Sequence, residues 1–229
     1  MEPVELALAV HQRLLQTYGY PEWRNPLPPL EELISTILSQ NTNDNNRDRA
    51  FASLRARFPT WEAVRDAPEE EVIRAIRSAG LANQKGPRIQ NILREISEAH
   101  GRLSLDFLRD WPVEQARDWL ARFKGVGPKT AAIVLLFSLN KPAFPVDTHI
   151  YRVSGRIGLR PAEMSVEQAH HHLASLFPEE AYYAAHLNLI RLGREICQAH
   201  RPACPVCPVR DLCAFYASQS QAEPLPAEA

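Results

Sequence analysis

The sequence predicts an all-α protein. Apolar residues recur at intervals of three and four along almost the whole chain, which is the period of one helix face, and no segment alternates as a strand does. Glycine and proline stand where these periodic runs stop and start. At 229 residues, 45% of them hydrophobic, the chain can bury a core as one large or two small domains.

The first half of the chain contains four apolar runs of helical period. These runs are Leu6–Leu15, Leu30–Leu38, Val72–Ile76 and Ile89–Ile96. Gly80 and Gly101 follow two of them, where a left-handed residue ends a helix. Pro68 and Pro112 stand at positions that begin a helix. Further along, Ser165 and Gln168 have the spacing of a capping box.

A helix–hairpin–helix is predicted in the middle of the chain. An amphipathic helix over Pro112–Phe123 runs into Gly125-Val126-Gly127, and a very apolar helix begins at Pro128. The glycines permit a tight turn with positive φ and expose backbone N–H groups at the start of the second helix, where the helix dipole favours a phosphate. A tight corner without a ligand is the alternative interpretation. Such a phosphate contact would position a duplex without reading its sequence.

Two polar residues near this hairpin are candidates for chemistry. Lys129 lies in the first turn of the second helix, and Asp147 lies 18 residues later in Pro145-Val-Asp147-Thr-His149. Residue type and position alone favour simpler roles, a phosphate contact for Lys129 and a helix N-cap for Asp147.

All four cysteines fall within 17 residues, at Cys197, Cys204, Cys207 and Cys213, with the spacing C-x6-C-x2-C-x5-C. Met1–Val10 carries two glutamates and does not resemble a secretory signal, so we expect a reducing compartment, in which disulfides are rare. Thiolates then indicate zinc or an iron–sulfur cluster. The single short C-x2-C pair with irregular flanks favours a [4Fe-4S] cluster, and four unligated buried cysteines are the alternative.

Composition excludes a membrane protein and a strongly basic chain. No apolar run approaches the roughly 18 residues that a membrane span requires. The net charge of −1 carries no bulk signal for nucleic acid. Local clusters of basic residues remain, and for each of them a solvated helix face is the favoured interpretation. They are Arg47, Arg49, Arg55 and Arg57; Arg74, Arg77, Lys85 and Arg88; Arg152, Arg156 and Arg160; and Arg191, Arg194, Arg201 and Arg210.

The hairpin run through Lys129, the Val146-Asp147-Thr-His149 motif and the cysteine spacing together resemble endonuclease III, the iron–sulfur branch of the helix–hairpin–helix DNA glycosylases. The resemblance extends from about Leu30 to Cys213. It implies a six-helix barrel-like domain over residues 25–139 and a cluster domain formed by 1–24 with 140–217. We expect the tail, 218–229, to be disordered. Lys129 and Asp147 would face each other across the cleft between the domains.

The same resemblance implies that Lys129 is the nucleophile and Asp147 the essential acid of a combined glycosylase and AP lyase. A base flipped out of the duplex exposes C1′, a carboxylate stabilises the developing positive charge, and attack by a neutral amine leads to a Schiff base and β-elimination. Thr36 stands where adenine-mismatch glycosylases carry a catalytic Glu, which argues against that branch. Proximity to a helix N-terminus favours the neutral amine, whereas Asp147 opposes it.

Further residues are implied as DNA contacts. Gln40 or Asn41 would fill the gap left by the flipped base, with Asn41 favoured, and Leu81 would wedge into the base stack. An ordinary polar helix cap and an ordinary packing contact are the respective alternatives. The remaining implied contacts are Asp44, Gly125, Gly127 and His149. The run His170-His171-His172 is interpreted as structurally incidental, because consecutive residues point to different faces of a helix.

The leading functional prediction is base-excision repair of oxidised pyrimidines, with cleavage 3′ to the abasic site. The expected partner is duplex DNA carrying a damaged base or an abasic site, bound by a monomer in the cytoplasm at the nucleoid. A uracil or thymine mismatch glycosylase is the alternative within the enzyme class. A non-catalytic iron–sulfur protein that binds DNA or senses redox state is the alternative from another class.

Overall fold

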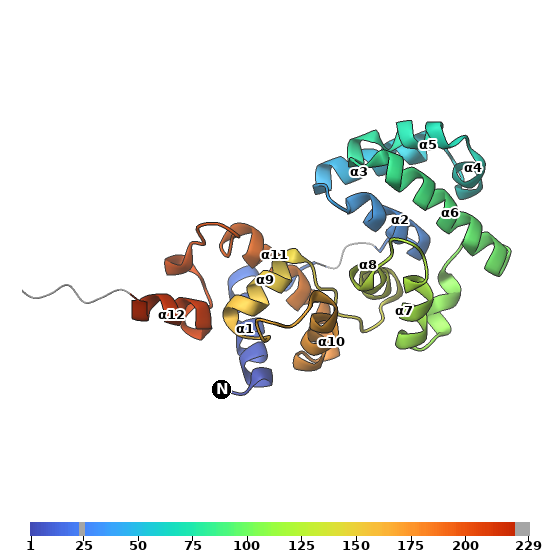
Figure 1. Ribbon diagram of the computed structural model, residues 1–229. Coiled ribbons are helices and arrows are strands. Elements are labelled where there is room, and N and C mark those ends of the chain that lie inside the picture. Colours follow the sequence, from blue (N-terminus) through green and yellow to red (C-terminus); the bar gives the residue numbers. More distant parts are fainter. Residues whose placement is uncertain (23–25, 223–229) are drawn as a thin grey trace, which may run out of the picture. The chain divides into compact units, whose positions relative to one another are not determined.

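The computed structural model describes residues 1–22 and 26–222. The described residues form helices, turns and loops with no strand among them, which confirms the all-α prediction (Figure 1). The chain divides into two compact units. One, the central unit, is Asn25–Lys141, and the other, the split unit, combines Met1–Arg24 with Pro142–Ala229.

The central unit is a bundle of short helices. Its elements are α2 (Pro29–Ser39), α3 (Asp44–Arg57), α4 (Trp61–Asp66), α5 (Glu69–Ala75), the 3-10 turn η1 (Arg77–Ala79), α6 (Ala82–His100), the 3-10 turn η2 (Asp106–Asp110), α7 (Val113–Ala121), α8 (Pro128–Ile133) and the π-helical turn η3 (Val134–Ser138). Helix α2 packs against α3, α6, α8 and η3, while α6 also packs against α4 and α5. Helix α2 therefore lies at the centre of this unit.

The periodic apolar runs form its core. Leu33, Ile34 and Ile37 of α2 are fully buried, as are Ile89 and Leu93 of α6. Full burial of one such side chain stabilises the folded state by about 1.5–3 kcal/mol. The sequence pattern therefore predicts this packing correctly, because the apolar stripe of each helix is the face that it buries.

The split unit joins the two ends of the chain. Its elements are α1 (Pro3–Tyr18), α9 (Thr148–Ile157), α10 (Val166–Leu176), the 3-10 turn η4 (Glu179–Ala181), α11 (Tyr182–Glu195), the 3-10 turns η5 (Cys204–Val206) and η6 (Arg210–Leu212), and α12 (Ala214–Ala222). Helix α1 buries Ala7, Val10 and Leu14 and packs against α10 and α11, and α11 packs against α9.

Most predicted helix ends are found where expected. Pro68 and Pro112 are the N-caps of α5 and α7, Gly101 ends α6 with φ +69°, and the Ser165 capping box with Gln168 is formed. The predicted helix over Pro112–Phe123 is shorter, because α7 ends at Ala121 and a turn leads into the hairpin.

The predicted disordered tail needs a correction. Helix α12 includes residues 218–222, which we expected to be disordered. Its first turn is anchored, because Phe215 packs against the guanidinium of Arg156, 4.9 Å from the ring centroid. The rest of the predicted tail, 223–229, lies outside the described residues.

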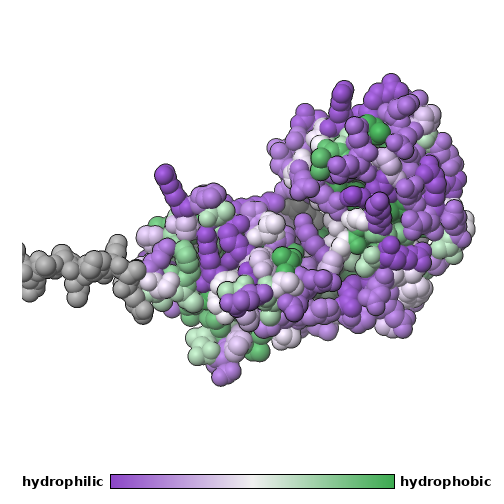
Figure 2. All heavy atoms as spheres, viewed as in Figure 1, coloured by the Kyte–Doolittle hydropathy of each residue, from purple (hydrophilic) through white to green (hydrophobic). Residues whose placement is uncertain are grey.

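Hydrophilic side chains dominate the face drawn in Figure 2, with small hydrophobic spots between them. In the part of the chain that the structure describes, no helix is both long enough and apolar enough to cross a membrane.

Candidate functional site

The predicted hairpin between α7 and α8 is formed, and its apolar residues anchor it. Phe123 and Val126 are 1% and 4% exposed, and the Val126 amide donates to the Phe123 carbonyl at 3.0 Å. Gly125 has φ +87°, which side-chain-bearing residues rarely adopt, whereas Gly127 is extended at φ −94°. Only the first of the two glycines is therefore required for its backbone conformation.

Helix α8 begins beyond the hairpin with amide groups that have no partner within the helix. Its first backbone bond runs from the Ala131 amide to the Gly127 carbonyl, at 3.0 Å. Pro128 has no N–H, so the amides of Lys129 and Thr130 precede that bond and have no partner within the helix. Lys129 is exposed on this first turn. The arrangement combines amide donors suited to an anion with a primary amine beside them.

A polar network that the sequence analysis did not predict holds the hairpin in place. The Gln40 side-chain amide donates to the Gly125 carbonyl at 3.0 Å, and Arg88 of α6 donates to Gln40 Oε1 at 2.9 Å. A Cβ atom at Gly125 would lie 2.4 Å from Arg88 Nε, so the turn and the guanidinium are in close contact. Gln40 therefore connects α6 to the hairpin.

Asn41 and Leu81 lie at two exposed turns of the central unit. Asn41 follows α2 with φ +54°, and Leu81 precedes α6 with φ +49°. Leu81 is 48% exposed, although a leucine in this conformation is strained. The alternative of a polar helix cap built from Asn41, Thr42 and Asn43 is present in part, because the Asn43 side chain accepts from the Asn46 amide and caps α3.

The other residue predicted near this turn, Asp44, begins α3 and forms an ion pair with Arg47 at 3.2 Å. Both side chains lie on the first turn of that helix, and both are at least partly exposed to solvent. The structure therefore places Asp44 beside a cation of its own chain.

Asp147 begins α9 in the split unit. Its Oδ1 accepts a hydrogen bond from the Ile150 amide at 2.7 Å, so the predicted N-cap is present, and the residue is partly exposed. This bond occupies one carboxylate oxygen and leaves Oδ2 outside it. Two residues on, the His149 ring nitrogen Nδ1 lies 3.2 Å from the Arg152 guanidinium.

Two buried histidines support the loop before Asp147. His170 Nδ1 lies 3.1 Å from the Phe144 carbonyl, and His186 Nδ1 lies 2.9 Å from the Pro145 carbonyl. They are 8% and 2% exposed. His172 contacts the Leu159 carbonyl at 2.9 Å through Nε2. Because His170 and His172 both contact backbone carbonyls, the interpretation of the histidine run as structurally incidental is wrong. The contacts of His170 and His186 join residues 26 and 41 positions apart, and no local sequence pattern predicts them.

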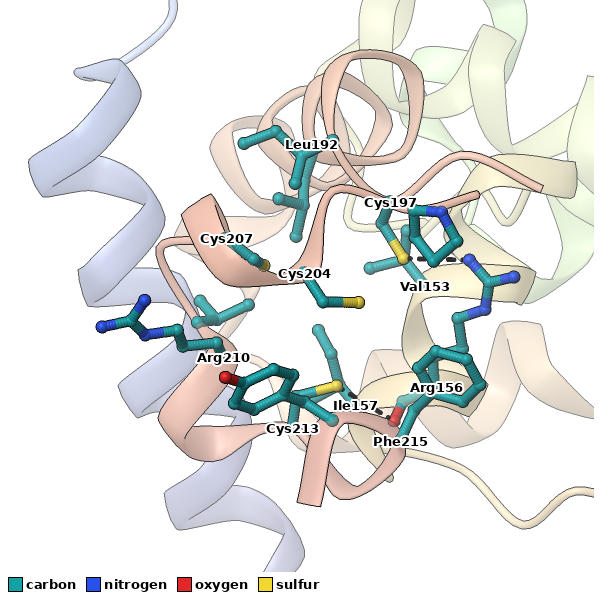
Figure 3. A pocket seen from close by; sticks show the side chains of 14 residues that line it. Val153, Arg156, Ile157, Leu192, Cys197, Cys204, Cys207, Arg210, Cys213 and Phe215 are labelled. Atoms are coloured by element: carbon teal, nitrogen blue, oxygen red, sulfur yellow. Dashed lines mark hydrogen bonds between the residues drawn. The ribbon is translucent and has the colours of Figure 1, made fainter. Parts of the chain in front are cut away.

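The four cysteines line one pocket of the split unit (Figure 3). All four are partly buried free thiols, and the pocket wall between them is apolar, with Val153, Ile157 and Leu192 drawn in the figure. Among the described residues, no three His, Cys, Asp or Glu side chains are grouped closely enough to hold a single metal ion. Burial and then the neighbouring cysteines raise the pKa of the Cys204 thiol, and burial raises that of Cys207.

Arginines of α9 and α1 fasten the loop that carries these cysteines. Arg152 donates to the Cys197 carbonyl at 3.0 Å and to the Gly193 carbonyl at 2.8 Å. Arg156 donates to the Gln198 and Ala199 carbonyls at 2.6 and 2.9 Å. Arg13 donates to the Pro208 carbonyl at 2.9 Å and pairs with Asp211. These arginines stabilise the loop internally.

Two of the arginines that the sequence places around the cysteines also have partners within the protein. Arg191 pairs with Glu195 at 2.9 Å and lies over the Tyr18 ring, and Arg210 donates to the Pro205 carbonyl. Their cluster is thus in part a set of structural contacts.

Comparison with known proteins identifies the family. Residues 34–179 match the family model described as HhH-GPD superfamily base excision DNA repair protein. Endonuclease III of Thermotoga maritima is 32% identical over 204 residues, which cover 89% of this chain and 91% of that protein. A candidate DNA glycosylase of Arabidopsis thaliana is 40% identical over 165 residues; these cover 72% of this chain, and the chain spans 56% of that protein's length.

A solved structure agrees over nearly the whole chain. The structure of a trapped endonuclease III–DNA covalent intermediate, an estranged-adenine complex, matches with a TM-score of 0.82 and 28% identity, covering 96% of this chain and all of that one. The matching folds and the matching sequences agree with the hairpin described above. The chain belongs to the HhH-GPD superfamily of base excision DNA repair proteins, among relatives that include endonuclease III.

Proposed function

We propose that this protein is a DNA glycosylase and AP lyase that removes oxidised pyrimidines from duplex DNA and cleaves the strand 3′ to the abasic site. The observation that carries the proposal is the exposed Lys129 in the first turn of α8, directly after a hairpin whose free amides suit a phosphate. The match to the structure of a trapped endonuclease III–DNA covalent intermediate supports an enzyme nucleophile.

The proposed reaction begins with a nucleotide extruded from the duplex. The Lys129 amine, in its neutral form, forms a bond to C1′ as the bond from C1′ to the base breaks, and the base leaves with the bonding electron pair. We assign Asp147 as the group that accepts the proton lost by the amine. The C1′–O4′ bond then breaks as O4′ takes that proton from Asp147, which opens the sugar ring and gives the Schiff base. The Asp147 carboxylate accepts the 2′ proton, and the bond from C3′ to the phosphate oxygen breaks as the phosphate leaves with its electron pair.

Asp147 combines two roles in this proposal. The bond from the Ile150 amide to Oδ1 holds the carboxyl group in one orientation at the start of α9. Because Oδ2 is not used by that cap, it remains available to stabilise the positive charge that develops on the sugar and to accept a proton. The cap and the catalytic role are therefore compatible.

The cysteine pocket fits a [4Fe-4S] cluster, which we propose as the cofactor. Four thiols from one loop line a single apolar pocket, and thiolates are the ligands that such clusters require. Cys197, Cys204, Cys207 and Cys213 would hold it. When bound, the cluster supplies a rigid cross-link of the loop, and the proposed reaction uses no group from it.

The DNA contacts follow from the exposed turns. Asn41 would occupy the gap left by the extruded base, because the neighbouring Gln40 is already bound to Gly125 and Arg88. Leu81 would insert into the stack, and the amides of Lys129 and Thr130, which follow the Gly125–Gly127 turn, would bind a phosphate. Asp44 and His149 would lie at the border of this surface. We propose that a single copy of the chain binds the duplex.

Schiff-base trapping tests the proposal. A duplex with an abasic site and sodium borohydride should yield a covalent adduct with the wild type and none with Lys129→Ala. Lys124→Ala is the matched control, since Lys124 is also an exposed lysine at this hairpin and should leave the adduct in place. Absence of an adduct with the wild type would contradict the lyase assignment and favour a non-catalytic DNA-binding protein.

A panel of duplexes identifies the substrate. Release of thymine glycol and dihydrouracil ahead of uracil and mismatched thymine is the expected order. Preference for uracil or mismatched thymine would instead assign the protein to mismatch repair, while leaving the role of Lys129 to the trapping experiment.

A further inference from the structure

Lys85 is a charged side chain inside the central unit. It is 1% exposed, and its ammonium nitrogen donates to the Leu38 and Ala79 carbonyls, at 2.8 Å each. A buried charge without partners is strongly unfavourable, so these two bonds determine where the nitrogen lies. Burial, and then the nearby charge of Arg88, lowers the pKa of Lys85 to about 8.

The two carbonyls belong to the ends of two different helices. Leu38 lies in the last turn of α2, and Ala79 is the last residue of η1. Carbonyl groups at a helix C-terminus have no partner within the helix and carry the negative end of its dipole. One cation therefore satisfies two helix ends at once, and it holds their oxygens within hydrogen-bonding reach of a single nitrogen.

Each of these helix ends leads directly to an exposed left-handed residue. Asn41 comes three residues after Leu38, and Leu81 comes two residues after Ala79. Asparagine tolerates this conformation, but leucine does not, so Leu81 in particular requires surrounding structure that maintains it. Lys85 lies at the point where both turns are attached to the core.

Neighbouring contacts reinforce this attachment. Arg88, three residues after Lys85 in α6, bonds Gln40 beside Asn41. Ser78 of η1 donates to the Asn46 carbonyl at 3.2 Å, which joins η1 to the start of α3, the helix that follows the Asn41 turn. The first two turns of α6 thus hold both exposed turns and, through Gln40, the hairpin.

We infer that Lys85 is a positioning residue that sets the spacing between Asn41 and Leu81, and thereby the protein's selectivity for a duplex with an unpaired or missing base. This inference rests on the DNA contacts proposed above. Binding of a gap filler and a wedge to one duplex requires both turns at fixed separation, because the stacked bases set the distance between the two insertion points. Undamaged duplex offers no such insertion points and is held by phosphate contacts alone.

The test compares two affinities. Dissociation constants are measured for a duplex with a tetrahydrofuran abasic-site analogue and for the same duplex undamaged. Lys85→Met is expected to weaken binding to the abasic duplex by about 10-fold or more and binding to the undamaged duplex by less than about 3-fold. The matched control is Lys141→Met, since Lys141 also donates to a backbone carbonyl, that of Trp111 at 2.6 Å, without serving either turn. It should change both affinities by less than about 3-fold.

A double-mutant cycle separates positioning from general destabilisation. In an Asn41→Ala, Leu81→Ala background, Lys85→Met should cost less than about 3-fold, because the residues through which it acts are absent. An equal loss in both backgrounds, or an equal loss for both duplexes, would overturn the inference. If circular dichroism shows that Lys85→Met is unfolded, Lys85→Arg replaces it. The arginine keeps donors for both carbonyls, so this variant should retain the selectivity for the abasic duplex. Loss of that selectivity in folded Lys85→Arg would overturn the inference.

The result of this binding test is distinguishable from the result of the test of the proposed reaction. Borohydride trapping by the wild type tests Lys129 and does not depend on Lys85. If the wild type forms the adduct but Lys85→Met keeps its selectivity, the proposed function stands and the positioning role is overturned.

Discussion

Replacement of Gly125 by alanine tests whether the hairpin depends on its close contact with α6. Gly125 has φ +87°, and an added Cβ would lie 2.4 Å from Nε, 2.5 Å from Cζ and 2.7 Å from Cδ of Arg88. These distances are too short for any Cβ contact, so the guanidinium must move away. Its departure would break the Arg88 bond to Gln40, and with it the support for the Gly125 carbonyl.

The expected loss of stability has two parts. A left-handed conformation costs an alanine about 1 kcal/mol, and loss of one hydrogen bond from a charged donor costs about 2 kcal/mol. The total of about 3 kcal/mol corresponds to a decrease in melting temperature of about 6–12 °C for a chain of this size. Thermal unfolding followed by circular dichroism measures it.

Gly127→Ala provides the matched control two residues away. Gly127 is extended, and an added Cβ would meet nothing within 4 Å, so its melting temperature should change by less than about 2 °C. Equal melting temperatures for the two variants would refute the argument that the turn and Arg88 restrain each other.

Three further predictions concern charge and ligands. Burial lowers the pKa of His11 below its ordinary value, so the unfolded state binds the proton first and the protein loses stability as the pH drops below about 6.5. Urea titrations at pH 7 and pH 5 should show a smaller loss of unfolding free energy for His11→Phe than for the wild type. Equal losses for the two proteins would contradict this. Because the pKa of Lys85 is lowered to about 8, the unfolded state holds more protons than the folded state between about pH 8 and pH 10.5. The wild type should therefore gain stability relative to Lys85→Met over this range, by at most about 1.4 kcal/mol per pH unit, and a difference that does not change with pH would contradict the lowered pKa of Lys85. Cys207→Ser should abolish the broad visible absorption of an iron–sulfur cluster in purified protein and make the loop after α11 more sensitive to protease, whereas an unchanged spectrum would exclude Cys207 as a ligand.

The local features of the fold were predictable because their causes lie within a few residues of one another. The capping box at Ser165, the proline starts of α5 and α7, and the glycine end of α6 each depend on backbone groups up to four positions away. The hairpin glycines and the cysteine spacing are equally local. Sequence reasoning reached the all-α class and the family from these signals.

Adjacent residues show what such reasoning could not decide. Gln40 and Asn41 were both candidates for the base gap, and only the packed structure shows that Gln40 is bound to Arg88 and to the hairpin, while Asn41 is exposed with a positive φ. Composition does not contain this distinction, because side-chain direction at the end of α2 depends on where α6 lies.

The sequence alone determined the helices, the hairpin and the grouping of the four cysteines. Tertiary structure decided which polar residues hold these parts together. Lys85 looked like one member of a basic cluster, yet it is buried against carbonyls 47 and 6 residues away, and His186 supports a carbonyl 41 residues away. Periodicity and capping arise from short-range geometry, whereas the partner of a buried polar group depends on which distant backbone is brought beside it by packing.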